Sequence, residues 1–125
     1  KGGVNQGPQG VVKLCGKLEW LRPNLPCCIS EETKQLATTE EQESHFNAVK
    51  TIWTTCKEKI LAQNLDQLVL DEIGLAVTFG FIDEDDVIKT LKKRPKSMDI
   101  ILTGPSIPNR VIEMADQVTK LRSGF

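Results

Sequence analysis

The sequence predicts an α/β domain built around a mostly parallel β-sheet. Two short apolar runs, at residues 68–70 and 100–102, each end abruptly in polar residues or glycine. Stretches with helical periodicity precede the first run and separate it from the second. Strands that alternate with helices in this way are typical of parallel sheets, because each crossover between parallel strands needs a connecting element such as a helix.

Length and charge set the broad class of protein. The chain has 125 residues, which predicts a single domain over residues 1–125 that folds without disulfides or a metal. Its net charge is −1, and basic and acidic residues are interspersed. This balance argues against a nucleic-acid partner and against an anionic membrane surface. No apolar stretch of the sequence is long enough to span a bilayer.

The cysteines indicate a reducing compartment. Cys15, Cys27, Cys28 and Cys56 show neither C-x-x-C spacing nor a Cys/His ligand pattern. The adjacent Cys27 and Cys28 cannot form a disulfide with each other without strain. We therefore expect free thiols and a cytoplasmic protein.

The first third of the chain predicts mostly irregular structure. Residues 1–10 are glycine-rich and polar, as in a loop, and residues 11–14 form a short apolar patch. Residues 18–22 alternate apolar and polar side chains, which predicts a half-buried strand. Residues 23–32 contain two prolines and two cysteines and are expected to be irregular.

A long helix is expected next. Thr38 with Glu41, and Thr39 with Gln42, both have the spacing of a capping box. Apolar residues then recur mostly at steps of three or four, at Phe46, Val49, Ile52, Trp53, Cys56, Ile60 and Leu61. This spacing predicts one buried helix face that continues to about residue 63, with Trp53 in the core.

The second half of the chain predicts two strands, three helices and a final strand. We expect a buried strand over residues 67–71 and a short helix over residues 74–81. Asp83 is a good N-cap for a helix over residues 84–93, which Pro95 ends. A second strand is expected over residues 99–103, and Pro108 begins a helix to about residue 115. Residues 118–121 predict a short last strand.

Polar residues follow both apolar strands and form the candidate site. Asp71 and Glu72 end the first strand, and Thr103 and Gly104 end the second. Ligands of parallel α/β sheets bind outside the carboxyl ends of the strands, so these four residues are expected to lie together. Paired carboxylates can hold Mg²⁺ against nucleotide phosphates. The alternatives are acids that cap the next helix and a turn that needs the conformational freedom of Gly104.

Other polar residues support weaker hypotheses. His45 lies beside the apolar face of the long helix and has no evident acid or nucleophile partner, so no catalytic residue is assigned. Lys92, Lys93 and Arg94 could contact phosphate, although a solvated helix end is the default interpretation. Residues 1–4 resemble the opening of a deviant phosphate-binding loop, K-G-G-x-G-K-[ST]. Residues 5–7 lack its glycine, lysine and hydroxyl, which argues against a partition-type ATPase.

Several segments, in order along the chain, resemble the ATP:corrinoid adenosyltransferases of the bacterial cobalamin pathway. Lys1 and Gly2, with Gly7 shortly after, resemble the lysine-glycine loop of that family. Residues 69–72 (VLDE) resemble its metal-binding strand. The remaining matches are R-P at residues 94–95, I-I-L-T-G at residues 100–104, and A-D-Q-V-T at residues 115–119.

The resemblance implies a three-layer fold of the P-loop NTPase type that is incomplete at the N-terminus, with this chain as the C-terminal part of the family's domain. It implies transfer of the 5′-deoxyadenosyl group of ATP to a reduced cobalt corrinoid, with ATP and Mg²⁺ as cofactors. Asp71 and Glu72 would hold the Mg²⁺. Lys1, Thr103 and Gly104 would contact the nucleotide. The family's first strand, phosphate loop and first helix are expected to lie outside this chain.

The sequence also departs from the family pattern. Residues 25–29 (LPCCI) lack the F-x-W aromatic pair that faces the corrin, Pro105 stands in place of an arginine, and Lys120 in place of a glutamate. The alternative function is therefore a non-catalytic relative that binds a nucleotide, a corrinoid or a protein. Contact of Cys27 and Cys28 with a corrinoid or a metal is a further alternative to loop thiols. An incomplete sheet exposes strand edges, which predicts a homodimer or a higher homo-oligomer.

Overall fold

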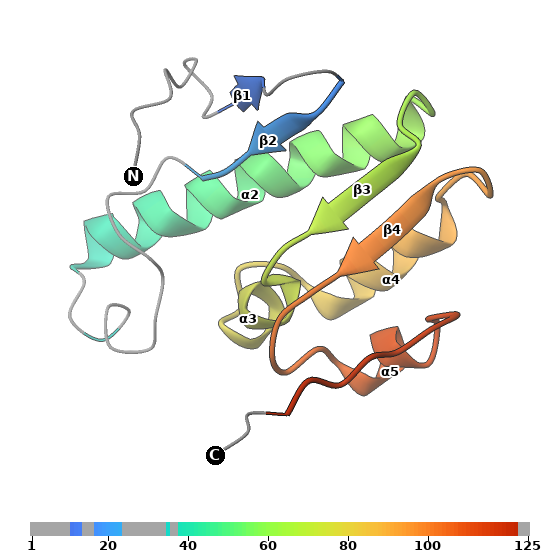
Figure 1. The fold of residues 1–125 in the computed structure, drawn as a ribbon. Helices are drawn as coiled ribbons and strands as arrows, with labels where there is room; N and C mark the ends of the chain where they lie inside the picture. The colour runs from blue at the N-terminus through green and yellow to red at the C-terminus, as the bar shows by residue number, and fades with distance from the viewer. Residues whose placement is uncertain (1–10, 14–16, 24–34, 36–37, 123–125) are drawn as a thin grey trace. The chain divides into compact units, whose positions relative to one another are not determined.

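The computed structural model describes residues 11–13, 17–23, 35 and 38–122 (Figure 1). The chain divides into two compact units, Lys1–Lys59 and Ile60–Phe125. The prediction of one domain over residues 1–125 stays a prediction.

The first unit holds an antiparallel pair of strands and nearly all of a long helix. Strand β1 (Val11–Lys13) pairs with β2 (Glu19–Leu21), with Val12 opposite Trp20. The strand expected over residues 18–22 is thus confirmed as β2, although its Trp20 side chain is 57% exposed. An ion pair of 2.7 Å joins Glu19 of β2 to Lys59 of the helix.

Helix α2 (Thr39–Leu61) begins with the capping box that the sequence predicts. The backbone N–H of Thr38 donates to Oε2 of Glu41 at 2.8 Å, and the backbone N–H of Glu41 donates to Oγ1 of Thr38 at 3.2 Å. The predicted apolar face is confirmed at Val49, Trp53, Cys56 and Ile60, which are buried, but Phe46 and Leu61 are exposed. Capping and periodicity therefore specify this helix locally, without information from the rest of the chain.

The second unit contains the remaining elements. They are β3 (Gln67–Leu70), α3 (Ile73–Thr78), α4 (Glu84–Lys92), β4 (Asp99–Leu102) and α5 (Asn109–Ile112). Strands β3 and β4 pair in parallel, with Leu70 opposite Leu102. The predicted α/β class with a small parallel sheet is confirmed by this pairing. The core of the unit includes Ile60, Val87 and Met98, which are almost completely buried.

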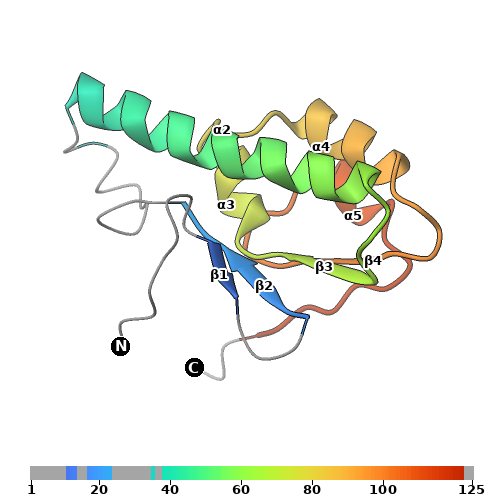
Figure 2. The same ribbon diagram turned by 90° about the horizontal axis from the view of Figure 1, so that it is seen from above.

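The β3–β4 sheet is covered on one face only within the described part of this unit. Figure 2 shows α4 and α5 on the same side of the two strands. Leu70 is buried, but Val69 and its register partner Ile101 are 52% and 43% exposed. The prediction that β3 is a buried strand is therefore wrong for alternate residues, because successive side chains point to opposite faces of a sheet.

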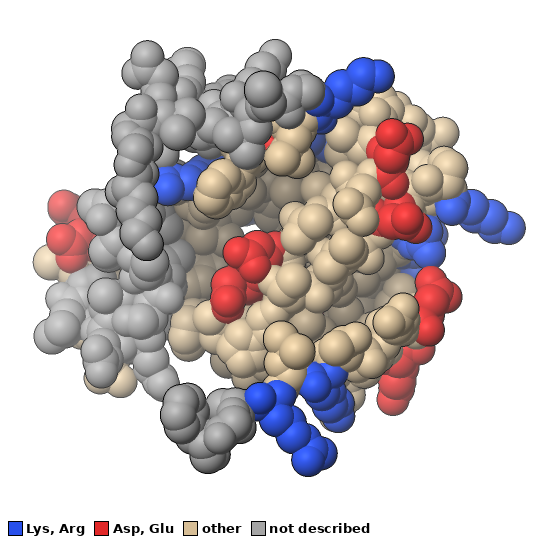
Figure 3. All heavy atoms as spheres, viewed as in Figure 1, with Lys and Arg blue, Asp and Glu red and all other residues tan. Residues whose placement is uncertain are grey.

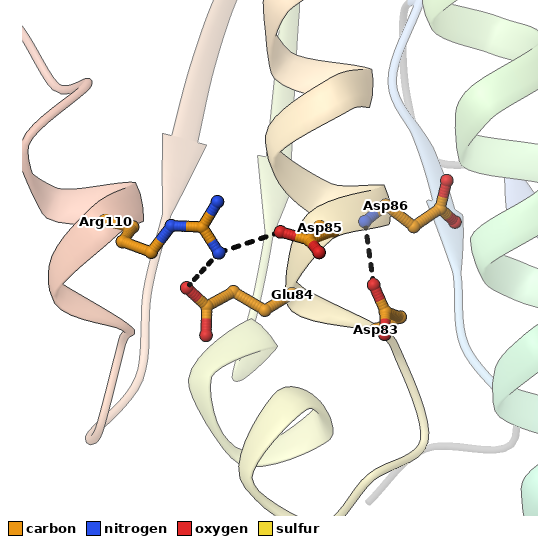
Figure 4. A network of polar contacts seen from close by, with 5 residues as sticks. All are labelled: Asp83, Glu84, Asp85, Asp86 and Arg110. Atoms are coloured by element: carbon orange, nitrogen blue, oxygen red, sulfur yellow. Dashed lines mark hydrogen bonds and ion pairs between the residues drawn. The ribbon is translucent and has the colours of Figure 1, made fainter.

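Helix α4 starts as the sequence predicts and forms ion pairs with α5. Oδ1 of Asp83 accepts a hydrogen bond from the backbone N–H of Asp86 at 3.1 Å, which confirms Asp83 as the N-cap. Figure 4 shows Arg110 of α5 reaching Asp85 at 2.8 Å and Glu84 at 3.4 Å. The hydrogen bond with Asp85 raises the pKa of the Arg110 guanidinium. Solvent screens this exposed contact, so it contributes to orientation more than to stability.

The C-terminal segment differs from its prediction. Helix α5 ends at Ile112, and the chain continues in tight turns in which Met114 N–H donates to Val111 O and Ala115 N–H to Ile112 O. Residues 118–121 form no strand, which corrects the predicted final strand. Val118 is 50% exposed and Leu121 93% exposed. Apolar composition alone does not make a strand, because the strand also needs a neighbour for its backbone hydrogen bonds.

The face of the described residues that Figure 3 shows is mixed in charge. In the view of Figure 3, lysine and arginine side chains alternate with aspartate and glutamate side chains. Within the described ranges, no helix is both long enough and apolar enough to cross a membrane.

Candidate functional site

The carboxyl ends of β3 and β4 bring the predicted site residues together. The backbone N–H of Thr103 donates to the carbonyl oxygen of Leu70 at 3.1 Å, which extends the ladder by one residue. The Thr103 hydroxyl then donates to Oδ1 of Asp71 at 2.5 Å, since an ionised carboxylate can only accept. The expectation that residues from the two strand ends meet is thus confirmed by the geometry.

Thr103 also connects to the second acid. Its Oγ1 accepts a hydrogen bond from the backbone N–H of Glu72 at 3.2 Å. Both acidic side chains are exposed. Among the described residues, no hydrogen bond or ion pair occupies Oδ2 of Asp71 or the carboxylate of Glu72. Three oxygens of the two carboxylates therefore remain available to a ligand.

Glu72 adopts an unusual backbone conformation. Its φ of 57° and ψ of 26° place it in the left-handed region at the N-cap of α3. Its carbonyl oxygen accepts hydrogen bonds from Leu75 N–H and Ala76 N–H, but its side chain makes no capping hydrogen bond. The alternative that this acid caps the next helix through its side chain is therefore wrong for Glu72. Strained backbone of this kind concentrates at ligand sites.

Gly104 contacts the same acid closely. Its φ is +115°, a conformation that glycine adopts readily and other residues rarely do. A Cβ atom added at position 104 would lie 3.0 Å from Glu72 Cα and 3.4 Å from Glu72 Oε2. The interpretation of Gly104 as a turn glycine is confirmed by this conformation, whereas its contact with a nucleotide stays a prediction.

Gly74 is a site residue that sequence reasoning missed. A Cβ atom at position 74 would overlap the carbonyl oxygen of Pro105 and lie 3.0 Å from the backbone nitrogen of Ile107. The first turn of α3 therefore packs directly on the loop that follows β4. The available signal was a glycine only two residues after Glu72.

The other candidates do not join these residues in the described chain. Lys1, Cys15, Cys27 and Cys28 lie outside the described residues. His45 is half-buried on α2. Lys92 and Lys93 are exposed.

Arg94 makes contacts that a solvated helix end would lack. Its Nη1 donates to the carbonyl oxygen of Met98 at 2.8 Å, and its Nη2 lies 3.8 Å from Asp116 Oδ2. Arg94 thus braces the turn that leads into β4. It also connects the R-P segment to the A-D-x-V-T segment, the two family-like pieces on either side of the T-G strand end.

The donor set at the strand ends fits Mg²⁺. Mg²⁺ usually keeps several waters and takes only one or two protein carboxylates together with substrate phosphates. Asp71 and Glu72 supply two adjacent exposed carboxylates. In the described part of the chain, no group of three or more His, Cys, Asp and Glu side chains could hold a metal by itself. The site therefore suits a cation that arrives with a nucleotide better than a closed structural metal.

Comparison with known proteins agrees with the sequence resemblance. The model of the ATP:corrinoid adenosyltransferase BtuR/CobO/CobP family matches residues 6–124. The chain belongs to this family.

Individual members of the corrinoid adenosyltransferase family match a shorter stretch. The chain is 30% identical over 84 residues to the corrinoid adenosyltransferase of Escherichia coli K12 and to corrinoid adenosyltransferase CobA of Salmonella typhimurium LT2. These matches cover 67% of the chain and 43% of each relative. A corrinoid adenosyltransferase of Sinorhizobium sp. is also 30% identical, with 66% and 39% covered. The matched region thus spans less than half the length of these curated relatives.

Proposed function

We propose that this chain provides the cation-binding part of an ATP:corrinoid adenosyltransferase in cobalamin biosynthesis. Membership of the family supports the reaction, and the hydrogen-bonded group of Asp71, Glu72 and Thr103 is the observation that supports the site. In this reaction the electron pair of reduced cobalt forms a bond to the 5′ carbon of ATP. The bond from that carbon to the triphosphate oxygen breaks, and triphosphate leaves with the electron pair.

The residues of the chain have distinct roles in this proposal. Asp71 and Glu72 hold Mg²⁺ through the carboxylate oxygens that carry no internal hydrogen bond. Thr103 and Gly104 line the same site, and Lys1 contributes to nucleotide binding. Bound Mg²⁺ neutralises charge on the triphosphate. The exposed position of both acids supports these roles, because phosphates and waters can then complete the coordination.

The finer features of the whole protein are part of the same proposal. We propose that β3 and β4 belong to a larger three-layer sheet of the P-loop NTPase type, in a cytoplasmic homodimer or higher homo-oligomer. The exposed neighbours Val69 and Ile101 support additional cover on the outer face of the sheet. A monodisperse monomer in analytical ultracentrifugation would argue against the oligomer.

A non-catalytic relative is the second candidate, and Pro105 is the observation that favours it. The family has an arginine at this place, whereas the carbonyl oxygen of Pro105 packs against Gly74. A loop without that guanidinium has one cation fewer to place against a triphosphate. Such a protein would bind ATP or a corrinoid without turnover.

An anaerobic adenosylation assay distinguishes the two candidates. Protein, Mg-ATP and chemically reduced cobalamin are mixed, and the formation of the cobalt–carbon bond is followed by the visible spectrum. We expect turnover that falls at least about tenfold in Glu72→Gln, the range for loss of a residue that supports a metal. Glu113→Gln is the control, because Glu113 is an exposed acid outside the site. Tight corrinoid binding without turnover would support the non-catalytic relative.

A further inference from the structure

The hydroxyl group of Thr103 has a specific place in the hydrogen-bond network. Oγ1 donates to Asp71 Oδ1 at 2.5 Å and accepts from Glu72 N–H at 3.2 Å. A threonine hydroxyl has one proton and two acceptor lone pairs. Its single proton is already bonded to Asp71, so the hydroxyl has no proton left to donate to a phosphate oxygen.

We propose that Thr103 is a positioning residue that orients the carboxylate of Asp71 for a divalent cation. By occupying Oδ1, it leaves Oδ2 as the Asp71 oxygen that can bind the cation. This inference rests on the proposed function, because Thr103 can orient Asp71 for a cation only if the proposed cation site exists. It differs from the nucleotide contact that the sequence predicts for Thr103.

The support for Thr103 itself is rigid. Its backbone N–H is bonded to Leu70 O, so the residue continues the parallel ladder. Asp71, in contrast, is exposed and lies just beyond β3. An exposed aspartate samples several rotamers, and ordering it has an entropic cost. The hydrogen bond from Thr103 orders the Asp71 carboxylate when the protein folds. The cation then encounters a carboxylate that is already oriented.

The test measures cation binding directly. Mn²⁺, which takes the same oxygen ligands as Mg²⁺, is titrated into the protein with ATP, and free Mn²⁺ is followed by electron paramagnetic resonance. We expect Thr103→Val to weaken Mn²⁺ binding about tenfold or more and Thr103→Ser to restore it to within about threefold. Thr54→Val is the control, because the Thr54 hydroxyl donates to Lys50 O within α2, away from the site residues. Circular dichroism verifies that each variant is folded.

A double-mutant cycle separates positioning from direct contact. In the Asp71→Ala background, Thr103→Val should have almost no further effect on Mn²⁺ affinity, because the group that it orients is gone. An equal loss in both backgrounds would overturn the proposal, because Thr103 would then affect the cation by a route other than Asp71. Unchanged Mn²⁺ affinity in Thr103→Val would also overturn it while leaving the proposed function intact. Failure of the parent protein to bind Mn²⁺ would overturn both.

Discussion

Gly74 lies so close to the carbonyl oxygen of Pro105 that any side chain at position 74 would overlap it. The backbone nitrogen of Ile107 also lies close, 3.0 Å from the same Cβ position. Both obstacles are main-chain atoms, which cannot move as a flexible side chain can. Helix α3 and the loop after β4 can therefore pack this closely only because residue 74 has no side chain.

We predict that Gly74→Ala destabilises the protein, although glycine to alanine within a helix normally stabilises it by about 0.5–1 kcal/mol. Overlap with a main-chain atom should cost about 1–3 kcal/mol instead. Urea denaturation followed by circular dichroism measures the difference. Gly80→Ala is the comparison. A Cβ atom there would meet nothing within 4 Å, whereas the backbone of residue 80 has a φ of +76°. Stabilisation by Gly74→Ala would contradict the close packing of α3 on the loop.

Glu72 should show opposite effects on stability and on binding. We predict that Glu72→Gly raises the free energy of unfolding by up to about 1 kcal/mol, since glycine removes a left-handed strain of roughly 1–2 kcal/mol but gains entropy in the unfolded chain. The same change should weaken the binding of Mn²⁺ to the protein at least about tenfold. Glu72→Gln retains the strain and loses only the charge. Destabilisation by Glu72→Gly would show that its side chain has a structural role.

The meeting of Asp71 and Thr103 could be predicted from sequence because one rule covers it. Residues that end two parallel strands arrive at the same edge of the sheet whatever the details of their side chains. The hydrogen bonds that Thr103 makes to Asp71 and Glu72 could not be predicted. They depend on a register in which Leu70 lies opposite Leu102, and on the left-handed turn at Glu72. The close packing of Gly74 on Pro105 has the same non-local origin.

The secondary structure likewise divides into features that local sequence determines and features that depend on distant residues. The starts of α2 and α4 were predictable because their caps involve residues three positions apart. The exposure of Val69 and the missing strand at residues 118–121 were not, because a strand depends on distant neighbours for its cover and for its backbone partners.

The start of α2 offers a test between two overlapping capping boxes. Of the two threonines, it is Thr38 that exchanges two hydrogen bonds with the residue three positions later, Glu41. We predict that Thr38→Ala lowers the free energy of unfolding by about 1 kcal/mol, whereas Thr39→Ala changes it by no more than about 0.5 kcal/mol. Chemical denaturation of both variants provides the measurement. Equal losses would indicate that both threonines cap the helix.

Cys56 should react slowly in the folded protein. Its side chain is buried on α2, and burial raises the pKa of the thiol above its ordinary value, although nearby Lys59 lowers it in part. Since the thiolate is the nucleophile, burial reduces both access and reactivity. We predict that iodoacetamide at pH 8 modifies Cys56 at least about tenfold more slowly in the native protein than in urea. Peptide mass spectrometry follows this cysteine separately from the other three.

The same burial predicts a dependence of stability on pH. The unfolded thiol loses its proton near pH 9.0, whereas the folded thiol retains it to higher pH. The contribution of Cys56 to stability is therefore fully present below about pH 9 and is lost as the pH rises through the folded pKa. Urea denaturation between pH 7 and 10 should show a steeper loss in the parent protein than in Cys56→Ala. Identical pH profiles, or native alkylation as fast as in urea, would mean that the thiol is accessible to solvent.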